Sequence, residues 1–295
     1  MLVDNTSTLN IKVSESTGVV HWRSESAGPL LPQALAQISP VVANGLSEGT
    51  FRELFELGAI YTETSRLCDW GYLTAEQKSG TYLRLHTQPR RYSLAQIDWR
   101  SRILSENDDF VIFDKPAGVP CHPMVDNQLE NLATGLSDFL KSEIHVTHRL
   151  DVGTRGLLLF AKTKNFQKQF NSLLSLRQVC KKYRVFTEAP TNFFQGQILT
   201  HYMHPSPYAP KRLEVAAFPG AQECLLRILM VSQTRTEVEL LTGRTHQIRA
   251  QFAASGFPLV GDSTYGNSQD TRPLGLEAYY LEFPYQNQSI HFTIA

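Results

Sequence analysis

Residues 148–162 read HRLDVGTRGLLLFAK. The apolar part, Leu157 to Ala161, has the length and composition of a buried β-strand. Asp151 precedes that strand by a Gly-containing turn and follows Arg149 by two residues. A carboxylate that enters a protein core costs several kcal/mol unless it is paired or reactive. The stretch therefore predicts a core strand and marks Asp151 as a candidate site residue.

The composition predicts a globular chain of about two domains. Of its 295 residues, 42% are hydrophobic and 19% are charged, which is typical of a folded protein. No apolar run approaches the roughly 20 residues of a membrane span, and the N-terminal residues lack the pattern of a secretory signal. The four cysteines form no Cys-x-x-Cys pair and show no zinc-ligand spacing. We therefore expect a cytoplasmic protein with no membrane or metal partner, and a monomer by default.

The net charge of zero conceals a segregation of charge. Residues 1–80 contain nine acidic and five basic residues, a net of −4, whereas residues 141–185 contain ten basic and two acidic residues, a net of +8. Positive charge around Asp151 indicates a polyanionic partner such as RNA. Charge alone fits the solvated face of a helix equally well.

The pattern of apolar residues predicts an N-terminal arm over 1–27, either a strand or an extended segment, a small domain over 28–95 and a main domain over 100–295. In the small domain, helical spacing within 30–38 and the segment 51–57 predict two helices, the second capped by Ser47 or Thr50 and ending at Gly58. The main domain combines several strand-like segments with helices expected over 131–141 and 165–177 and from 243 onward. This predicts an α+β fold with a mixed, mainly antiparallel central sheet flanked by helices.

Four motifs, in the same order, resemble those of the RluA-type RNA pseudouridine synthases. HRLD with Thr154, Gly156 and Leu157 resembles HRLDxxTSGLLLxAK. Residues 114–123 resemble NKPxGxxxHP, residues 181–183 resemble K-x-Y, and residues 243–249 resemble GRTHQLR. The matches span roughly 110–266. The resemblance implies a pseudouridine synthase-like fold and an isomerase that converts uridine to pseudouridine in ribosomal or transfer RNA without a cofactor.

The resemblance also implies roles for three residues. Asp151 matches the catalytic aspartate, a nucleophile that attacks either the ribose or the uracil ring. Tyr183 matches the active-site tyrosine that packs on the base. Arg244 matches the motif arginine, and we expect it to pair with Asp151, because an ionised carboxylate in a closed site needs a cation. The alternatives are a core aromatic for Tyr183 and a surface arginine for Arg244.

A uridine inside folded RNA must be flipped out of its stack to react. Arg149 could fill the vacated space or bind phosphate. We expect Leu157 or Ile248 to form an aliphatic wall of the pocket, and His122, His148 and His246 to serve as structural hydrogen-bonding groups. The residues expected to contact RNA are Arg149, Arg155, Lys115, Lys182 and Arg249.

The chain departs from the family pattern at three motif positions, which bears on substrate choice more than on the reaction. Arg155 replaces the usual Ser, Asp114 stands where Asn is common, and Ile248 stands where Leu is usual. Residues 28–95 also resemble, distantly, the alpha-L RNA-binding module. Thr62-Glu63-Thr64 stands where that module carries basic and Asn-Gly residues, so we expect a degenerate module that does not grip RNA.

Two alternative functions remain open at this stage. A non-catalytic RNA-binding or ribosome-assembly protein could retain the fold, although it would not require Asp151, Tyr183 and Arg244 together. A glycosidase could use Asp151 as its nucleophile, but retaining glycosidases normally need a second carboxylate as general acid. The flanking sequence offers none with a matching context.

Overall fold

The computed structural model describes residues 10–14 and 17–295. The chain divides into a small unit, formed by residues up to Ser93 together with 123–134, and a large unit, formed by 94–122 and 135–295. This division differs from the predicted one. Residues 123–134 belong to the small unit although they lie well inside the sequence of the predicted main domain.

The small unit contains a four-stranded antiparallel sheet in the order β1-β2-β6-β4. Two of these strands come from the segment 1–27, for which the sequence suggested a strand or an extended segment. Its described part is therefore strand, and it belongs to this sheet and not to a separate arm. Val20, Trp22, Leu83, Leu85 and Ile60 point into the core of the unit. The strands are β1 (Ile11–Ser14), β2 (Val19–Arg23), β4 (Ile60–Tyr61) and β6 (Tyr82–His86).

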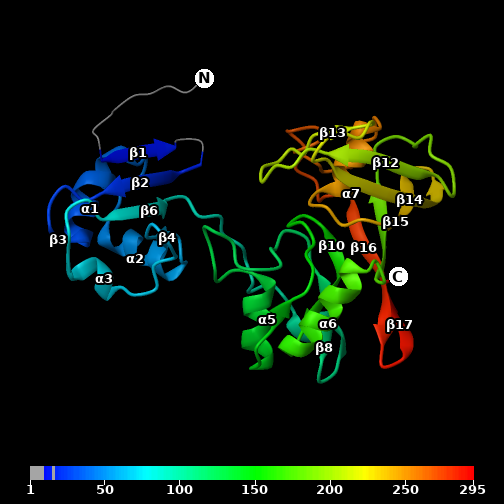
Figure 1. The fold of residues 1–295 in the computed structure, drawn as a ribbon, viewed down its shortest axis with the longest axis horizontal. Coiled ribbons are helices and arrows are strands. Elements are labelled where there is room, and N and C mark those ends of the chain that lie inside the picture. Colours follow the sequence, from blue (N-terminus) through cyan, green and yellow to red (C-terminus); the bar gives the residue numbers. More distant parts are fainter. Residues whose placement is uncertain (1–9, 15–16) are drawn as a thin grey trace. The chain divides into compact units, whose positions relative to one another are not determined.

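Helices complete the small unit, as Figure 1 shows. Ser47 caps α2, accepting a hydrogen bond from the backbone N–H of Thr50 (3.1 Å), and Gly58 follows that helix in the left-handed conformation (φ 69°). The predicted cap at Ser47 and the stop at Gly58 are therefore confirmed. The helices are α1 (Leu30–Ile38), η1 (Ser39–Val41), α2 (Glu48–Glu56) and α3 (Gly71–Thr74), and a short pair joins β3 (Gly28–Pro29) to β5 (Glu76–Gln77).

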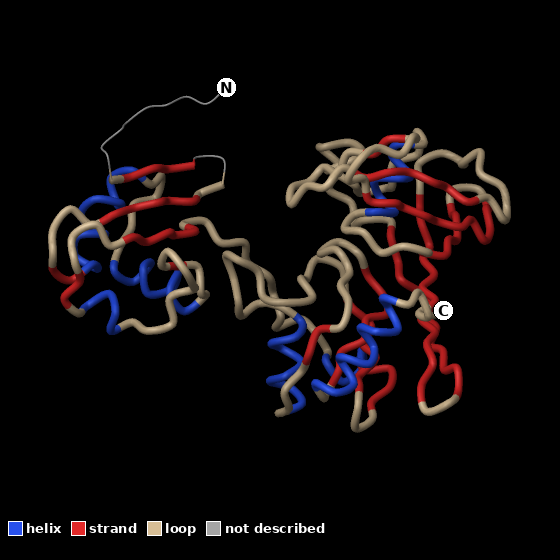
Figure 2. Tube along the Cα trace, in the orientation of Figure 1, coloured by secondary structure: helices blue, strands red, loops and turns tan. Residues whose placement is uncertain are grey.

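The large unit is built on one long sheet in the order β13-β12-β14-β15-β11-β16-β10-β8-β7, with β17 beside β16 and β9 beside β10. Among the described residues, β10 pairs with β16 in parallel, and every other strand pair of this sheet is antiparallel. Figure 2 shows how strands dominate this unit. The predicted α+β fold with a mixed, mainly antiparallel sheet is confirmed.

The bounds of the large unit's elements agree with the predicted helices to within a few residues. The strands are β7 (Ile103–Glu106), β8 (Phe110–Lys115), β9 (His145–Val146), β10 (Arg155–Ala161), β11 (Cys180–Phe186), β12 (Ile198–Met203), β13 (Leu213–Glu214), β14 (Gln222–Ser232), β15 (Arg235–Leu240), β16 (Leu276–Tyr285) and β17 (Gln288–Thr293). The helices are α4 (Trp99–Arg102), α5 (Leu132–Leu140), α6 (Lys164–Ser175) and α7 (Gln247–Ala254), of which α5 contains the boundary between the units.

The apolar run of the deciding stretch forms β10, and both of its faces are covered. Leu157 and Leu159 pack in one core cluster with Phe170 of α6. On the other face, Leu158 is in register with Phe113 of β8, whose ring contacts Trp99. A strand covered on both faces needs an uninterrupted apolar run rather than an alternating one, which explains the sequence.

Candidate active site

The sheet brings Tyr183 to the start of β10. Gly156 of β10 is in register with Ala278 of β16, and Ala278 is in register with Tyr183 of β11. A Cβ atom added to Gly156 would lie 2.2 Å from the carbonyl oxygen of Ala278, so no larger residue fits between these strands. Ala278 alone therefore separates Tyr183 from Gly156, in the strand that Asp151 precedes.

Asp151 lies in the turn that leads into β10. The backbone N–H of Thr154 donates to the carbonyl of Asp151 (3.0 Å), and the N–H of Gly118 donates to the carbonyl of Val152 (2.8 Å). The Asp151 side chain remains 21% exposed. The turn thus holds the carboxylate at the edge of the core, where a substrate can reach it.

Lys115 is an internal support of this turn. Its ammonium group, fully buried, donates to the carbonyls of Pro116 (3.0 Å), Val152 (2.9 Å) and Thr154 (2.7 Å). These bonds use all three donors of a lysine. Burial lowers the pKa of Lys115 to about 8, although the charge of Asp151 opposes the shift. The prediction that Lys115 contacts RNA is therefore wrong.

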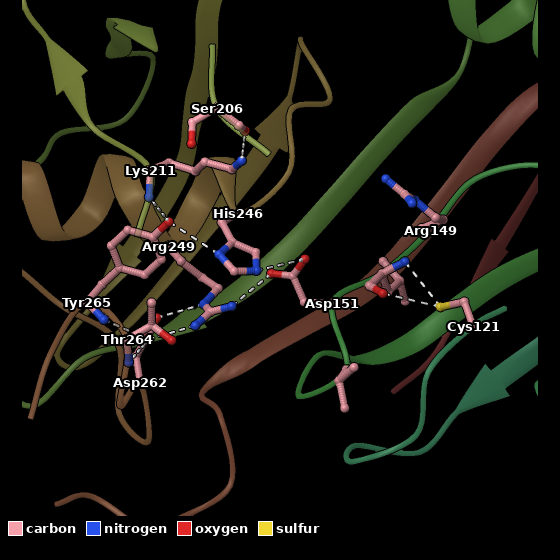
Figure 3. A network of polar contacts seen from close by, with 12 residues as sticks. Cys121, Arg149, Asp151, Ser206, Lys211, His246, Arg249, Asp262, Thr264 and Tyr265 are labelled. Carbon is pink, nitrogen blue, oxygen red and sulfur yellow. Dashed lines mark hydrogen bonds and ion pairs between the residues drawn. The ribbon is translucent and has the colours of Figure 1, made fainter. Parts of the chain in front are cut away.

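Arg249, in the first turn of α7, forms the ion pair with Asp151. Its Nη1 lies 3.2 Å from Oδ2 of Asp151, and its guanidinium also binds both oxygens of Asp262 at 2.8 Å (Figure 3). The predicted pair between Asp151 and Arg244 is wrong. Arg244 lies exposed before the helix, and its backbone N–H donates to the side chain of Gln247 (3.0 Å). The side chain of Arg249 is only 10% exposed, and its predicted contact with RNA stays a prediction.

The two carboxylates around Arg249 are not equivalent. Asp262 is fully buried, and it also accepts the backbone N–H groups of Thr264 (3.0 Å) and Tyr265 (3.1 Å). Burial raises the pKa of Asp262, but the hydrogen bonds and charge of Arg249 outweigh burial and hold that pKa below its usual value. Burial likewise lowers the pKa of Arg249, and its bonds to Asp262 more than reverse this. Asp262 therefore fixes the guanidinium, and Asp151 receives a single charged hydrogen bond.

His246 faces the other oxygen of Asp151. Its Nε2 lies 3.9 Å from Oδ1 of Asp151, and its Nδ1 lies 3.2 Å from the hydroxyl of Tyr265. That hydroxyl accepts the backbone N–H of Lys211 (2.7 Å), so its own proton is available to Nδ1 and the imidazole proton belongs on Nε2. Burial lowers the pKa of His246 against the opposing charge of Asp151, which favours the neutral ring.

Tyr183 is buried in β11 and lies within electrostatic reach of Asp151. Burial raises the pKa of its hydroxyl, and the negative charge of Asp151 raises that pKa further. The hydroxyl makes no hydrogen bond within 10–14 and 17–295. A core tyrosine would normally have a partner for this group, so the position fits a pocket residue.

The other predicted RNA contacts lie in different surroundings. Arg149 is exposed and donates to Nε2 of His122 (3.1 Å), which leaves it the freest of the group to meet RNA. Arg155 pairs with Glu277 (2.8 Å), which also binds Arg184 (3.1 Å). The positive charge of Arg155 is therefore already compensated by a carboxylate of the protein. Lys182 lies over the ring of Tyr280, 4.1 Å from its centroid.

Two further predictions concern the pocket wall and the histidines. Leu157 packs in the core against α6, so it does not supply the wall, whereas Ile248, buried in the first turn of α7, stays a candidate. His148 accepts the backbone N–H of Leu159 at Nε2 (3.2 Å), and burial lowers its pKa to about 3. That is the structural role expected of it.

The sequence reasoning missed Asp262, Tyr265 and Lys211. Gly261-Asp262 and Tyr265-Gly266 were visible as turn signals, but a turn needs no buried carboxylate. The available signal was Arg249 itself, which stands in the apolar helix IRAQF and must find a buried counter-ion there. No cluster of three His, Cys, Asp or Glu side chains that could hold a metal occurs among the described residues.

The comparisons with known proteins agree with this geometry. A family model described as RNA pseudouridylate synthase matches residues 109–254. The chain is 36% identical to RNA pseudouridine synthase 6, chloroplastic, of Arabidopsis thaliana, over 67% of this chain and 49% of that protein. It is 26% identical to ribosomal large subunit pseudouridine synthase D of Haemophilus ducreyi, over 90% and 82% of the two chains.

A solved structure shares the fold. The structure titled human RNA pseudouridylate synthase domain containing 4 superposes with a TM-score of 0.55 at 22% identity, over 67% of this chain and 89% of that one. The chain belongs to the RluA-type family of RNA pseudouridine synthases. It spans about half of the length of the plant relatives that it matches. No helix in the part of the chain that the structure describes has the length and hydropathy to cross a membrane.

Proposed function

We propose that this protein isomerises uridine to pseudouridine in ribosomal or transfer RNA, with Asp151 as the nucleophile. The observation that carries the proposal is the arrangement of Asp151, Arg249 and Asp262. Two carboxylates share one guanidinium, so the group retains a net charge of −1, and Asp262 takes the two shorter bonds. Asp151 is thereby oriented while its Oδ1 carries no strong hydrogen bond.

The geometry fits a reaction in which one carboxylate does the covalent work. Asp151 attacks the ribose or the uracil ring, and the bond between the ribose and the base nitrogen breaks. The base turns, its carbon 5 bonds to the ribose, and the bond to Asp151 breaks. Carbon 5 loses its proton to solvent and the freed nitrogen 1 takes one up, so the product is an isomer of the substrate. Tyr183 provides an aromatic surface beside Asp151 for the detached base, and Arg249 stabilises the carboxylate each time it regains its charge.

The names of the relatives support an RNA substrate. The Haemophilus ducreyi relative is named for the ribosomal large subunit, and the Arabidopsis thaliana relative for RNA in general. The uridine that this chain modifies, its cytoplasmic location and its monomeric state stay predictions.

Release of tritium from RNA labelled at carbon 5 of uridine tests the proposal, because that bond breaks only when carbon 5 becomes attached to the ribose. Total RNA from cells that lack the gene is the substrate. We expect release by the wild-type protein and a loss of at least ~1,000-fold in Asp151→Asn, since the nucleophile itself is removed. Equal release by both proteins would exclude Asp151, and no release by either would favour the non-catalytic alternative.

A further inference from the structure

The outer face of the small unit's sheet is lined by basic and aromatic side chains. Strand pairing aligns Lys12 of β1, His21 of β2, Arg84 of β6 and Tyr61 of β4 in one row across the four strands. Side chains in register lie on the same face of a sheet. The neighbouring rows of the same face contain Arg23 with Tyr82 and Val19 with His86. We call this set the outer face.

The planar groups of the outer face lie against one another. The guanidinium of Arg84 lies 4.4 Å from the ring centroid of Tyr61, and that of Arg23 lies 5.1 Å from the centroid of Tyr82. The hydroxyl of Tyr82 also bonds Nδ1 of His21 (2.5 Å). Such contacts restrict the rings and guanidinium groups, so a flat ligand that stacks on them loses little further freedom.

Two polar atoms of the outer face have no partner. Nε of Arg84 and Nε2 of His86 are buried and make no hydrogen bond to any residue that the structure describes. Buried polar groups nearly always find a partner, and an ordered water is the usual one where the chain supplies none. A cavity of about 690 Å³ borders the outer face at Arg23 and Tyr82, but residues 62–69, which include Glu63 and Asp69, form most of its wall, so it is not part of the outer face.

The charge of the outer face is opposite to that of the rest of the small unit. The four strands contain no acidic residue, whereas α2 contains Glu48, Glu53 and Glu56. The acidic neighbours of the outer face are Glu63, which pairs with Arg23 (2.7 Å), and Asp126, which pairs with Arg90 (3.4 Å). The net charge of −4 over residues 1–80 therefore hides a local positive surface. Arg84, which belongs to this surface, lies outside residues 1–80.

We propose that the outer face binds a single-stranded segment of the RNA substrate, with a base stacked on Tyr82 and phosphates against Lys12 and Arg84. The ring of Tyr61 is already covered by the guanidinium groups of Arg84 (4.4 Å) and Arg66 (5.0 Å) and serves to position Arg84. A positive groove with interleaved aromatic side chains is the general solution for single-stranded nucleic acid. The inference rests on the proposed function for the identity of the polyanion. It places the contact on the strands, not on the helix-to-strand turn at residues 62–64, where the sequence is not basic.

Fluorescence anisotropy of a labelled single-stranded 12-mer RNA with the full chain tests this proposal. We expect the double variant Lys12→Gln, Arg84→Gln to bind at least ~10-fold more weakly at moderate salt. The slope of log K against log salt concentration should become shallower by ~0.7 for each phosphate contact that is lost. Tyr82→Leu should weaken binding ~5–150-fold without changing that salt dependence, because one stacked base is worth about 1–3 kcal/mol. Melting curves establish that each variant is folded.

Arg52→Gln is the matched control, because Arg52 lies on α2 over Trp70, at 4.2 Å from its ring. The proposal is overturned if the wild type does not bind the 12-mer, if the outer-face variants bind as Arg52→Gln does, or if polyglutamate competes as well as RNA. The two proposals can fail separately. If the wild type releases tritium but the outer-face variants bind RNA as tightly as it does, the outer face is not the binding surface and the proposed function still stands.

Discussion

At the scale of single residues, the planar guanidinium of Arg249, which binds Asp262 and Asp151 at once, determines the position of the Asp151 carboxylate. A lysine at this position keeps the charge but cannot bind Asp262 through two nitrogen atoms and reach Asp151 with a third. We expect Arg249→Lys to lower the rate of tritium release by ~10–100-fold, the equivalent of one charged hydrogen bond of about 1.5–3 kcal/mol. Arg244→Lys is the control, with an expected change below ~3-fold. A larger loss in the control would return the ion-pair role to Arg244.

His148 provides a pH-dependent contribution to stability. Its pKa is about 3 in the folded protein, whereas an unfolded histidine titrates near 6.5. The folded state therefore binds fewer protons between these values, so this contribution is fully present above pH ~6.5 and is lost as the pH falls toward 3. One such group changes the free energy of unfolding by up to about 1.4 kcal/mol per pH unit.

The measurement is urea unfolding from pH 7 to pH 4, with His148→Gln for comparison. Glutamine keeps an acceptor for the backbone N–H of Leu159 but does not titrate, so the variant should lose stability less steeply. His291, exposed on β17, supplies His291→Gln as a control. Parallel pH profiles for the wild type and His148→Gln would contradict the prediction.

The role of a single residue could be predicted from the sequence where its neighbours in space are also its neighbours in the chain. Asp151 stood next to an apolar run, so the cost of burying it was visible from the sequence. The choice between Arg244 and Arg249 was not local, because it depends on which side of the start of α7 faces the turn before β10. It depends also on Asp262, which lies 13 residues beyond Arg249 in a loop.

At the scale of elements, Gly156 fixes the junction between β10 and β16. Its φ is 108°, and a Cβ atom would lie 2.2 Å from the carbonyl oxygen of Ala278. We expect Gly156→Ala to cost more than about 3 kcal/mol of folding free energy, because backbone strain and the clash add together. Gly196→Ala is the matched control, since Gly196 also has a positive φ (85°) but open space around it, and it should cost about 1–2 kcal/mol.

Thermal or urea unfolding measures both variants. Equal losses would mean that the strands separate at little cost, and the row from Gly156 to Tyr183 would not define the pocket. The strand β10 itself was predictable, because its two covered faces demand a continuous apolar run. For β1 and β2 the sequence left a strand and an extended segment equally open, because the basic and aromatic side chains of the outer face weaken the alternating apolar pattern of these strands.

At the scale of the whole molecule, the order of segments along the chain does not match their grouping in space. Residues 123–134 pack in the small unit through contacts with distant residues. The N–H of Gln128 donates to the carbonyl of Leu57 (2.8 Å), the hydroxyl of Tyr61 to Val125 (2.8 Å), and Arg91 pairs with Glu130 (2.8 Å). None of these contacts leaves a periodic signal in the sequence, so the predicted division at 95–100 could not include them.

This grouping predicts the behaviour of a fragment of residues 94–295. The fragment retains the whole central sheet but removes the partners of 123–134, so that segment should lose its order while β10 keeps its own. Hydrogen exchange measured by NMR tests this. The amide of Gln128 should be protected in the full chain and exchange nearly freely in the fragment, because its acceptor on Leu57 is gone. The amide of Leu158, inside the sheet, is the internal control and should stay protected in both. Retained protection at Gln128 would mean that the large unit orders this segment by itself, and loss of protection at Leu158 as well would mean that the large unit requires the small one in order to fold.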